Sequence, residues 1–204
     1  MFDQNPPAWL PAAAFGLVLA ASLVRGRILR AQGVQAYGFS YRSQVQQAAE
    51  RFWKLAVALM ATAILIGWFA PRWEPALGRP AWADAAATRW PAALLLLGGG
   101  LIVLAGQQAM GASWRVGVPS DGPGDLVARG IFRVSRNPVF VGMFAMVVGV
   151  FLWSPTFISA AATPLAAAIM SMQVRIEEEA LLAKHGDAYL AYSVRVPRWV
   201  WPIG

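Results

Sequence analysis

Residues 138–174 read PVFVGMFAMVVGVFLWSPTFISAAATPLAAAIMSMQV and contain no charged side chain. A helix needs about 20 mostly apolar residues to cross roughly 30 Å of hydrocarbon. The Ser154-Pro155 pair divides this stretch into two apolar runs, Pro138–Trp153 and Thr156–Val174. Because proline interrupts a helix interior, the stretch predicts a helical hairpin in the membrane. Its first arm is short for a full span.

Three further apolar runs precede the hairpin, at Ala8–Val24, Trp53–Ala70 and Trp90–Met110. The first lacks the basic start and small-residue cleavage site of a signal peptide, so we expect it to be retained. Hydrophobic residues make up 58% of the chain and charged residues only 13%, against about 25% charged in soluble domains. The fold class predicted is an all-α integral membrane protein with about five transmembrane helices.

Basic residues orient these helices, because fourteen of the 17 Lys and Arg side chains fall on one side of the predicted membrane. They are Arg25, Arg27, Arg30, Arg42, Arg51, Lys54, Arg115, Arg129, Arg133, Arg136, Arg175, Lys184, Arg195 and Arg198. Arg72, Arg79 and Arg89 lie on the other side. The positive-inside rule makes the richer side cytoplasmic, with the N-terminus outside an inner (plasma) membrane and the C-terminus in the cytoplasm.

The composition also limits which metal sites and binding partners are expected. The chain has no cysteine and a single histidine, His185, so we expect no metal site. The net charge of +7 is compatible with nucleic acid or anionic lipid. The apolar runs favour lipid, and no nucleic-acid partner is expected.

The segment 111–137 ahead of the hairpin ends in Arg136-Asn137-Pro138. Asn is a preferred N-cap and Pro a preferred first helical residue, so Asn137 is predicted to cap the helix that Pro138 opens. A helix start beside Arg136 suits an anionic group. The predicted organisation is three transmembrane helices in residues 1–110, followed by a functional region in residues 111–204.

The last apolar run continues into Arg175-Ile176-Glu177-Glu178-Glu179. Acids at a helix C-terminus oppose the macrodipole, which predicts a cationic partner, either Arg175 or a ligand. Further on, Tyr189 and Tyr192 share a helical face at spacing i, i+3. They are predicted to pack on lipid or to form an aromatic wall beside a sulfonium or amine.

Several of these motifs occur in a fixed order: Leu126-Val127, Gly130-Ile131-Phe132, Arg136-Asn137-Pro138-x-Phe140-x-Gly142, Glu177-Glu178-x-x-Leu181, Gly186, Tyr189, Tyr192 and Val196-Pro197-Arg198. This ordered set resembles the isoprenylcysteine carboxyl methyltransferase family, of the bacterial type, and the related phospholipid N-methyltransferases. The resemblance covers roughly residues 114–198. It implies S-adenosylmethionine as cofactor, bound where segment 111–137, the last helices and the C-terminal tail meet.

The resemblance also implies roles for individual residues. The cofactor-binding set it implies is Asp125, Leu126, Val127, Gly130, Phe132, Arg136, Asn137, Pro138, Val139, Phe140 and Glu177. The residues expected to orient the acceptor, as the catalytic set, are Arg175, Glu178 and Tyr192. Gln173 and Arg195 are the expected substrate-binding residues.

This sequence departs from the family pattern at several positions. Asn137 replaces a histidine, and Phe132 and Phe140 each replace a tyrosine. Gln173 stands where the prenylcysteine enzymes carry a substrate-binding arginine one turn before the acid, and glutamine cannot neutralise a carboxylate. The sequence therefore disfavours a prenylcysteine carboxylate as substrate, while O-, S- and N-methylation all stay open.

The function predicted is methyl transfer from S-adenosylmethionine to a lipophilic small molecule or lipid at the cytoplasmic membrane boundary. A sulfonium methyl is already electrophilic, so the protein must mainly align donor and acceptor and exclude water. Two alternatives remain: an NADPH-dependent membrane reductase of the sterol or steroid type, and a non-enzymatic membrane scaffold.

Overall fold

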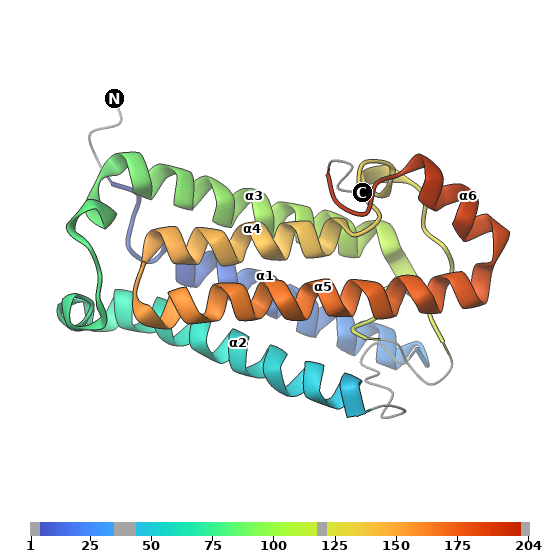
Figure 1. The fold of residues 1–204 in the computed structure, drawn as a ribbon, viewed down its shortest axis with the longest axis horizontal. Coiled ribbons are helices and arrows are strands. Elements are labelled where there is room, and N and C mark those ends of the chain that lie inside the picture. Colours follow the sequence, from blue (N-terminus) through green and yellow to red (C-terminus); the bar gives the residue numbers. More distant parts are fainter. Residues whose placement is uncertain (1–4, 35–43, 118–121, 201–204) are drawn as a thin grey trace.

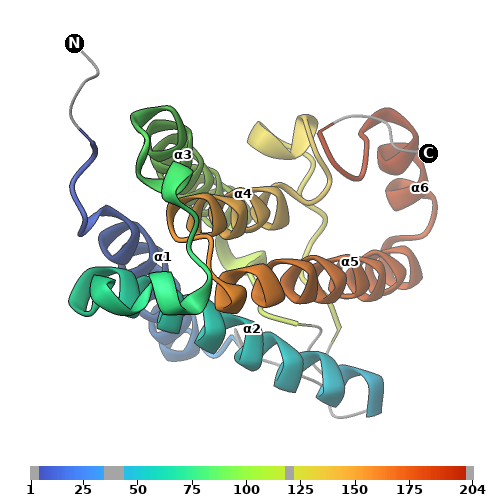
Figure 2. The ribbon, with the colours of Figure 1, turned by 60° about the vertical axis from the view of Figure 1, so that its left-hand side comes forward.

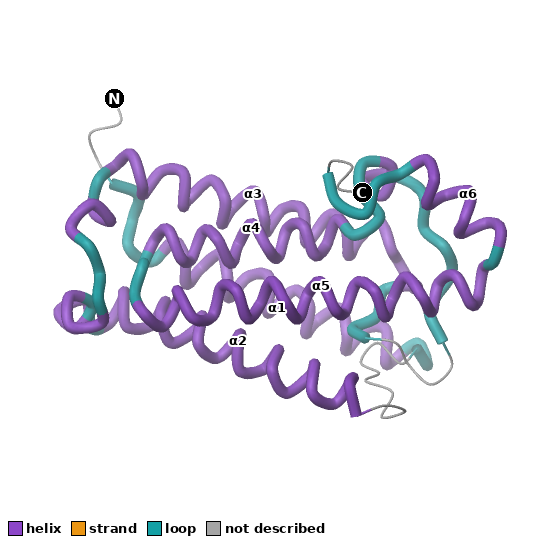
Figure 3. The backbone as a smooth tube through the Cα atoms, in the orientation of Figure 1, coloured by secondary structure: helices purple, strands orange, loops and turns teal. Residues whose placement is uncertain are grey.

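The computed structural model describes residues 5–34, 44–117 and 122–200, which form helices and connecting segments without a strand (Figure 3). The α-helices are α1 (Leu10–Ala31), α2 (Gln44–Phe69), α3 (Ala86–Met110), α4 (Pro138–Trp153), α5 (Phe157–His185) and α6 (Asp187–Arg195). Short 3-10 turns are η1 (Pro71–Trp73), η2 (Pro75–Leu77), η3 (Ala81–Asp84), η4 (Gly111–Ser113) and η5 (Gly130–Arg133).

Helices α1 to α5 run back and forth along one long axis, so that the C-terminal ends of α1, α3 and α5 lie at the same end of the bundle (Figure 1). Helix α6 lies beyond that end, on the side of α3 and α4, and η1–η3 lie at the opposite end (Figures 1 and 2). The core between the helices is mainly small and aliphatic, with Ala56, Met60, Leu96, Val150 and Ala162 almost fully buried.

Four helices, α1, α2, α3 and α5, are long and apolar enough to cross a membrane by length and composition. Helix α4 has 16 residues, about 24 Å at 1.5 Å per residue, which is shorter than the hydrocarbon core. The all-α membrane fold is confirmed. The predicted five spans become four full-length candidates and one shorter apolar helix, which is the run that looked short in the sequence.

Helices α3 and α4 pack closely and antiparallel because glycines meet where they touch. A Cβ atom on Gly99 would lie 2.6 Å from the Gly142 carbonyl oxygen, and one on Gly142 would lie 2.5 Å from the Gly99 oxygen. Nearer the C-terminal end of α3, Gly106 faces Val139 in the first turn of α4. Small residues allow such close backbone approach within a membrane. This contact places the first residues of α4 beside the last turns of α3.

Helix α5 is longer than its apolar run. It begins after Thr156, which forms a capping box with Ser159, and it ends at His185 instead of Val174. The three acids at 177–179 therefore lie inside the helix, and the argument that they oppose a macrodipole at its C-terminus was wrong. The helix-forming residues Glu, Ala, Leu and Lys extend it beyond the apolar part.

The opposite end of the bundle is fastened by a buried ion pair. Arg79 Nη1 lies 3.0 Å from Glu74 Oε2, and both side chains are almost fully buried. Ser154 also hydrogen-bonds to Glu74, and Arg79 donates to the Trp153 carbonyl oxygen at 3.2 Å. These bonds hold the turn between α4 and α5, and so set the position of α5 relative to α4.

Candidate functional site

Glu178 of α5 is the centre of a polar cluster, called here the Glu178 cluster, formed with Arg136, Asn137 and Arg198. Its carboxylate accepts from Arg136 Nε at 3.1 Å and from Asn137 Nδ2 at 3.0 Å. Arg198 Nη2 lies 2.8 Å from the other carboxylate oxygen. Glu178 is only 8% exposed, and a buried carboxylate needs such pairing to remain charged. Three separate chain segments are joined at this one side chain.

Asn137 occupies the N-cap position of α4, and Pro138 is the first helical residue, as predicted. The Asn137 side chain does not cap the helix, however, because it donates to Glu178 and to the Arg198 carbonyl oxygen. The backbone nitrogen of Arg136 also donates to the Pro197 oxygen at 2.9 Å. Asn137 therefore ties the start of α4 to α5 and to the C-terminal tail.

A hollow of about 640 Å³, counted out to its open mouth, lies beside the Glu178 cluster. Its walls come from the end of α3, residues 113–117 and 123–127, η5, the start of α4, α5 and α6. The lining residues are Met110, Ser113, Arg115, Gly117, Pro123, Gly124, Asp125, Leu126, Val127, Phe132, Arg136, Asn137, Glu177, Glu178, Leu181, Tyr189 and Tyr192. The segment before α4 and the acidic part of α5 thus meet around one space.

The end of α5 holds the loop wall of this hollow. Lys184 Nζ donates to the Pro123 oxygen at 2.5 Å, and His185 Nε2 lies 3.0 Å from the Gly124 oxygen. A Cβ atom on Gly124 would lie 2.7 Å from Cα of Ser113, whose hydroxyl accepts from the Asp125 backbone nitrogen. Glycine at position 124 is therefore required for the backbone there to lie so close to Ser113.

Helix α6 supplies an aromatic wall. Tyr189 and Tyr192 are both buried, with ring centroids 6.2 Å apart in an edge-on arrangement. The Tyr192 hydroxyl donates to the Phe132 carbonyl oxygen at 2.7 Å, which fixes η5 against α6. Burial raises the pKa of each phenol to about 12, so both are neutral donors at physiological pH.

The charges lining the hollow are three carboxylates and two guanidiniums. Glu178 is neutralised inside its cluster. Glu177 accepts a hydrogen bond from Gln173 Nε2 at 3.1 Å, and neither Glu177 nor Asp125 forms an ion pair with the residues described. Arg115 uses its Nη1 to bind the loop carbonyls of Ala112 and Trp114. The site therefore offers an acidic face to a ligand.

Comparison with known proteins gives one finding. Residues 87–187 match the phospholipid methyltransferase family. The match runs from the first turn of α3 to the first residue of α6, and so includes α4, α5 and most of the hollow's lining. No curated protein and no solved structure matches the chain. The match points to a membrane methyltransferase.

The hollow brings together nine of the residues singled out in the sequence. Those lining the hollow are Asp125, Leu126, Val127, Phe132, Arg136, Asn137, Glu177, Glu178 and Tyr192. Arg136 and Asn137 line the hollow as members of the Glu178 cluster. Most of their side-chain donors already form hydrogen bonds within the protein. Their roles toward a ligand stay predictions.

The other seven residues singled out lie outside the lining. Gly130 has φ +60° and opens η5, while Pro138 is buried in the first turn of α4. Phe140 packs against the bundle core, and Val139 against Gly106. These four residues have structural positions next to the lining and do not line the hollow themselves.

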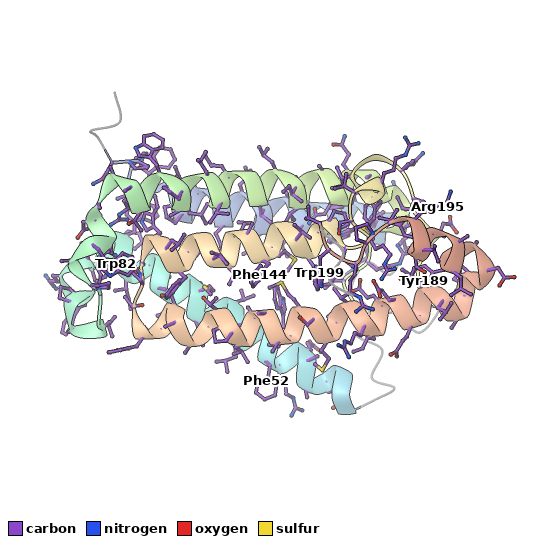
Figure 4. The ribbon with its side chains drawn as sticks, turned by 45° about the horizontal axis from the view of Figure 1, so that its top comes forward. Phe52, Trp82, Phe144, Tyr189, Arg195 and Trp199 are labelled. Atoms are coloured by element: carbon purple, nitrogen blue, oxygen red, sulfur yellow. The ribbon has the colours of Figure 1, made fainter. Side chains whose placement is uncertain are left out.

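The remaining three are Arg175, Gln173 and Arg195. Arg175 and Arg195 are exposed, and Figure 4 shows Arg195 on the outer side of α6, away from Tyr189. Glu178 has Arg136 and Arg198 as its cationic partners, and Arg175 forms no ion pair with the acids at 177–179 in the described chain. The other predicted partner of the acids, a cationic ligand, stays a prediction. Gln173 contacts the hollow only through Glu177.

Arg198 and Leu181 were given no role from the sequence. Arg198 is an ion-pair partner of Glu178, and Leu181 lines the hollow. Tyr189, which was predicted as part of an aromatic wall, lines the hollow too. Leu181 lies one helical turn after Glu177, so the i, i+4 spacing on a long helix was the available signal. Nothing in the sequence pairs Arg198 with Glu178.

Proposed function

We propose that this protein transfers a methyl group from S-adenosylmethionine to a lipophilic acceptor at the cytoplasmic boundary of the membrane. The observation that carries the proposal is the hollow with an acidic face, built by α5, α6 and residues 113–117 and 123–127, within and beside the family-matched region. The position at the ends of the long apolar helices gives access both from water and from lipid.

The charges of the hollow fit this cofactor. S-adenosylmethionine carries a sulfonium and an ammonium against a single carboxylate, so it is a net cation. The Glu177 carboxylate, which is oriented by Gln173 and has no ion pair in the described chain, is placed to receive such a cation. A charge-assisted contact of this kind contributes about 1.5–3 kcal/mol.

The rest of the site holds its shape and limits water. Leu126, Phe132 and Leu181 give apolar walls that suit the uncharged parts of a ligand. The Glu178 cluster fixes the start of α4 and the tail against α5, so these walls keep their positions. When bound, S-adenosylmethionine would supply an electrophilic methyl group. The protein's contribution is then alignment of the acceptor and exclusion of water.

The position of the hollow at the end of a membrane helix supports a lipophilic methyl acceptor. The walls of the hollow begin at Met110, the last residue of the membrane helix α3. Large apolar side chains such as Leu101 and Phe144 remain exposed along α3 and α4, as expected for a surface facing lipid. We therefore propose a lipid or another lipophilic molecule, delivered from the bilayer, as the methyl acceptor.

Binding of S-adenosylhomocysteine and S-adenosylmethionine to the detergent-purified protein, measured by calorimetry, tests the cofactor assignment. Glu177→Gln should weaken S-adenosylmethionine binding by about 10- to 100-fold, because it removes the charge but keeps the shape. The neighbouring exposed Glu179→Gln is the matched control and should bind as the wild type does.

Transfer itself is tested with native membranes and S-adenosylmethionine carrying a labelled methyl group. Label should appear in the extracted lipid fraction and be lost in Glu177→Gln. Absence of binding at millimolar cofactor, or binding of NADPH instead, would refute the proposal.

A further inference from the structure

The Tyr189 side chain carries a buried hydroxyl group that no other described residue uses. It is 5% exposed and lines the hollow, yet its hydroxyl has no hydrogen-bond partner among the residues that the structure describes. Burying an unpartnered hydroxyl is unfavourable, because it loses its bonds to water without gaining others. Such a group inside a ligand site is best explained by a partner that arrives with the ligand.

The neighbouring tyrosine shows that this arrangement is specific to Tyr189. Tyr192 lies one helical turn away and is equally buried, but its hydroxyl donates to the Phe132 oxygen. Arg115 has an unpartnered Nε in the same hollow, although its Nη1 binds two backbone carbonyls. Among the described lining residues, Tyr189 is therefore the buried side chain whose entire hydrogen-bonding capacity is unused.

The surroundings of Tyr189 indicate what part of a ligand it receives. It belongs to an apolar cluster with Tyr192 and Val196, against which Leu126 and Leu181 pack. Leu181 lies four residues after Glu177, on the same face of α5 and toward the helix end. The hollow is thus acidic at Glu177 and apolar one turn further from the bilayer, and the two halves are roughly 6 Å apart.

This division matches the two halves of a sulfonium nucleoside. The charged sulfonium suits Glu177, which is nearer the membrane, where a lipid acceptor must meet the methyl group. A flat nucleobase suits the apolar cluster of Leu126, Leu181 and Tyr189, because aromatic and aliphatic walls bind its faces. The ring nitrogens and ribose oxygens of a nucleoside are hydrogen-bond acceptors, and a neutral phenol is a donor.

Resting on the proposed function, we infer that Tyr189 is a cofactor-binding residue whose hydroxyl donates a hydrogen bond to the nucleoside half of the methyl donor. Figure 4 shows Tyr189 on the side of α6 that faces α5. The high pKa of this phenol, about 12, keeps the donor proton in place at physiological pH.

Two substitutions of the same kind test the inference, because Tyr189→Phe and Tyr192→Phe each remove one hydroxyl. Without ligand, Tyr189→Phe should melt at or above the wild-type temperature, since it removes an unpartnered buried group. Tyr192→Phe should melt lower, since it breaks the bond to Phe132. A lower melting temperature for Tyr189→Phe, comparable with that of Tyr192→Phe, would show that the hydroxyl serves the fold and would overturn the inference.

Binding supplies the second measurement. Tyr189→Phe should weaken S-adenosylhomocysteine about five- to tenfold, as expected for one neutral hydrogen bond. It should weaken 5′-methylthioadenosine, which is the nucleoside half alone, by the same factor in competition. Unchanged affinity in Tyr189→Phe, or failure of methylthioadenosine to compete at all, contradicts the inference. If the wild type binds no S-adenosylhomocysteine, the proposed function itself fails.

Discussion

At the residue scale, Glu178 is the side chain on which the site most depends. Glu178→Ala would leave the largely buried Arg136 and the more exposed Arg198 without their shared partner. Removing one member of a buried ion pair typically costs about 3–5 kcal/mol of unfolding free energy. We expect a large fall in the thermal midpoint measured in detergent.

The adjacent Glu179→Ala provides the control for this prediction. Glu179 is exposed and forms no ion pair with described residues, so its replacement should change stability by less than about 0.5 kcal/mol. Equal effects of the two substitutions would mean that Glu178 is not the point at which α4, α5 and the tail are joined.

The two tyrosines of α6 give a pH-dependent prediction. Burial raises the pKa of each from 10.0 to about 12 in the folded protein. The unfolded state therefore loses these protons first, so the stability they provide is complete below pH 10 and declines as the pH rises toward 12. Tyrosinate absorbance of the folded protein should appear well above the pH at which the denatured chain titrates.

Because the chain has four tyrosines, this titration needs the Tyr37→Phe/Tyr41→Phe double variant. Those two residues lie outside the part of the chain that the structure describes. A midpoint near 10 in the folded double variant would contradict the burial of Tyr189 and Tyr192.

At the element scale, the contact between α3 and α4 depends on glycine. In Gly99→Ala the new methyl group would meet the Gly142 carbonyl oxygen at 2.6 Å, a backbone atom that cannot rotate away. Overpacking of this kind costs about 1–3 kcal/mol. Because α4 carries Asn137, we also expect weaker S-adenosylhomocysteine binding.

The adjacent glycine gives a matched control for that substitution. Gly98→Ala faces open space, and alanine is favoured over glycine in a helix by up to about 1 kcal/mol. Its thermal midpoint in detergent should equal or exceed that of the wild type. If both variants lose stability alike, the α3–α4 glycine contact is not what limits packing.

Hydropathy predicted the elements well but their ends poorly. The hairpin with its turn at Ser154-Pro155 and the run of α3 were expected. The extension of α5 to His185 was not, because hydropathy marks only the part of a helix that lies in lipid. Likewise, Asn137 was recognised as the residue before a helix, but its actual partner Glu178 is 41 residues away. Long-range pairings of this type leave no periodic signal in a sequence.

At the scale of the whole molecule, the two ends differ in what they hold. One end carries η1–η3 and the buried Glu74–Arg79 pair, while the other carries the hollow, the Glu178 cluster and α6 (Figure 1). Most basic residues belong to the second end, so the positive-inside rule predicts that the hollow faces the cytoplasm. S-adenosylmethionine is made there, which makes this orientation a requirement of the proposed function.

Cysteine labelling tests that orientation directly, because the natural chain has no cysteine. Ala85, at the start of α3, and Ala188, in α6, are both exposed and lie at opposite ends of the bundle. In intact bacterial cells whose outer membrane is made permeable, a membrane-impermeant maleimide should label Ala85→Cys and spare Ala188→Cys. After lysis both should react, which confirms that each thiol is accessible. Labelling of Ala188→Cys in intact cells would place the hollow outside, where no methyl donor is supplied, and the proposed reaction would then be untenable.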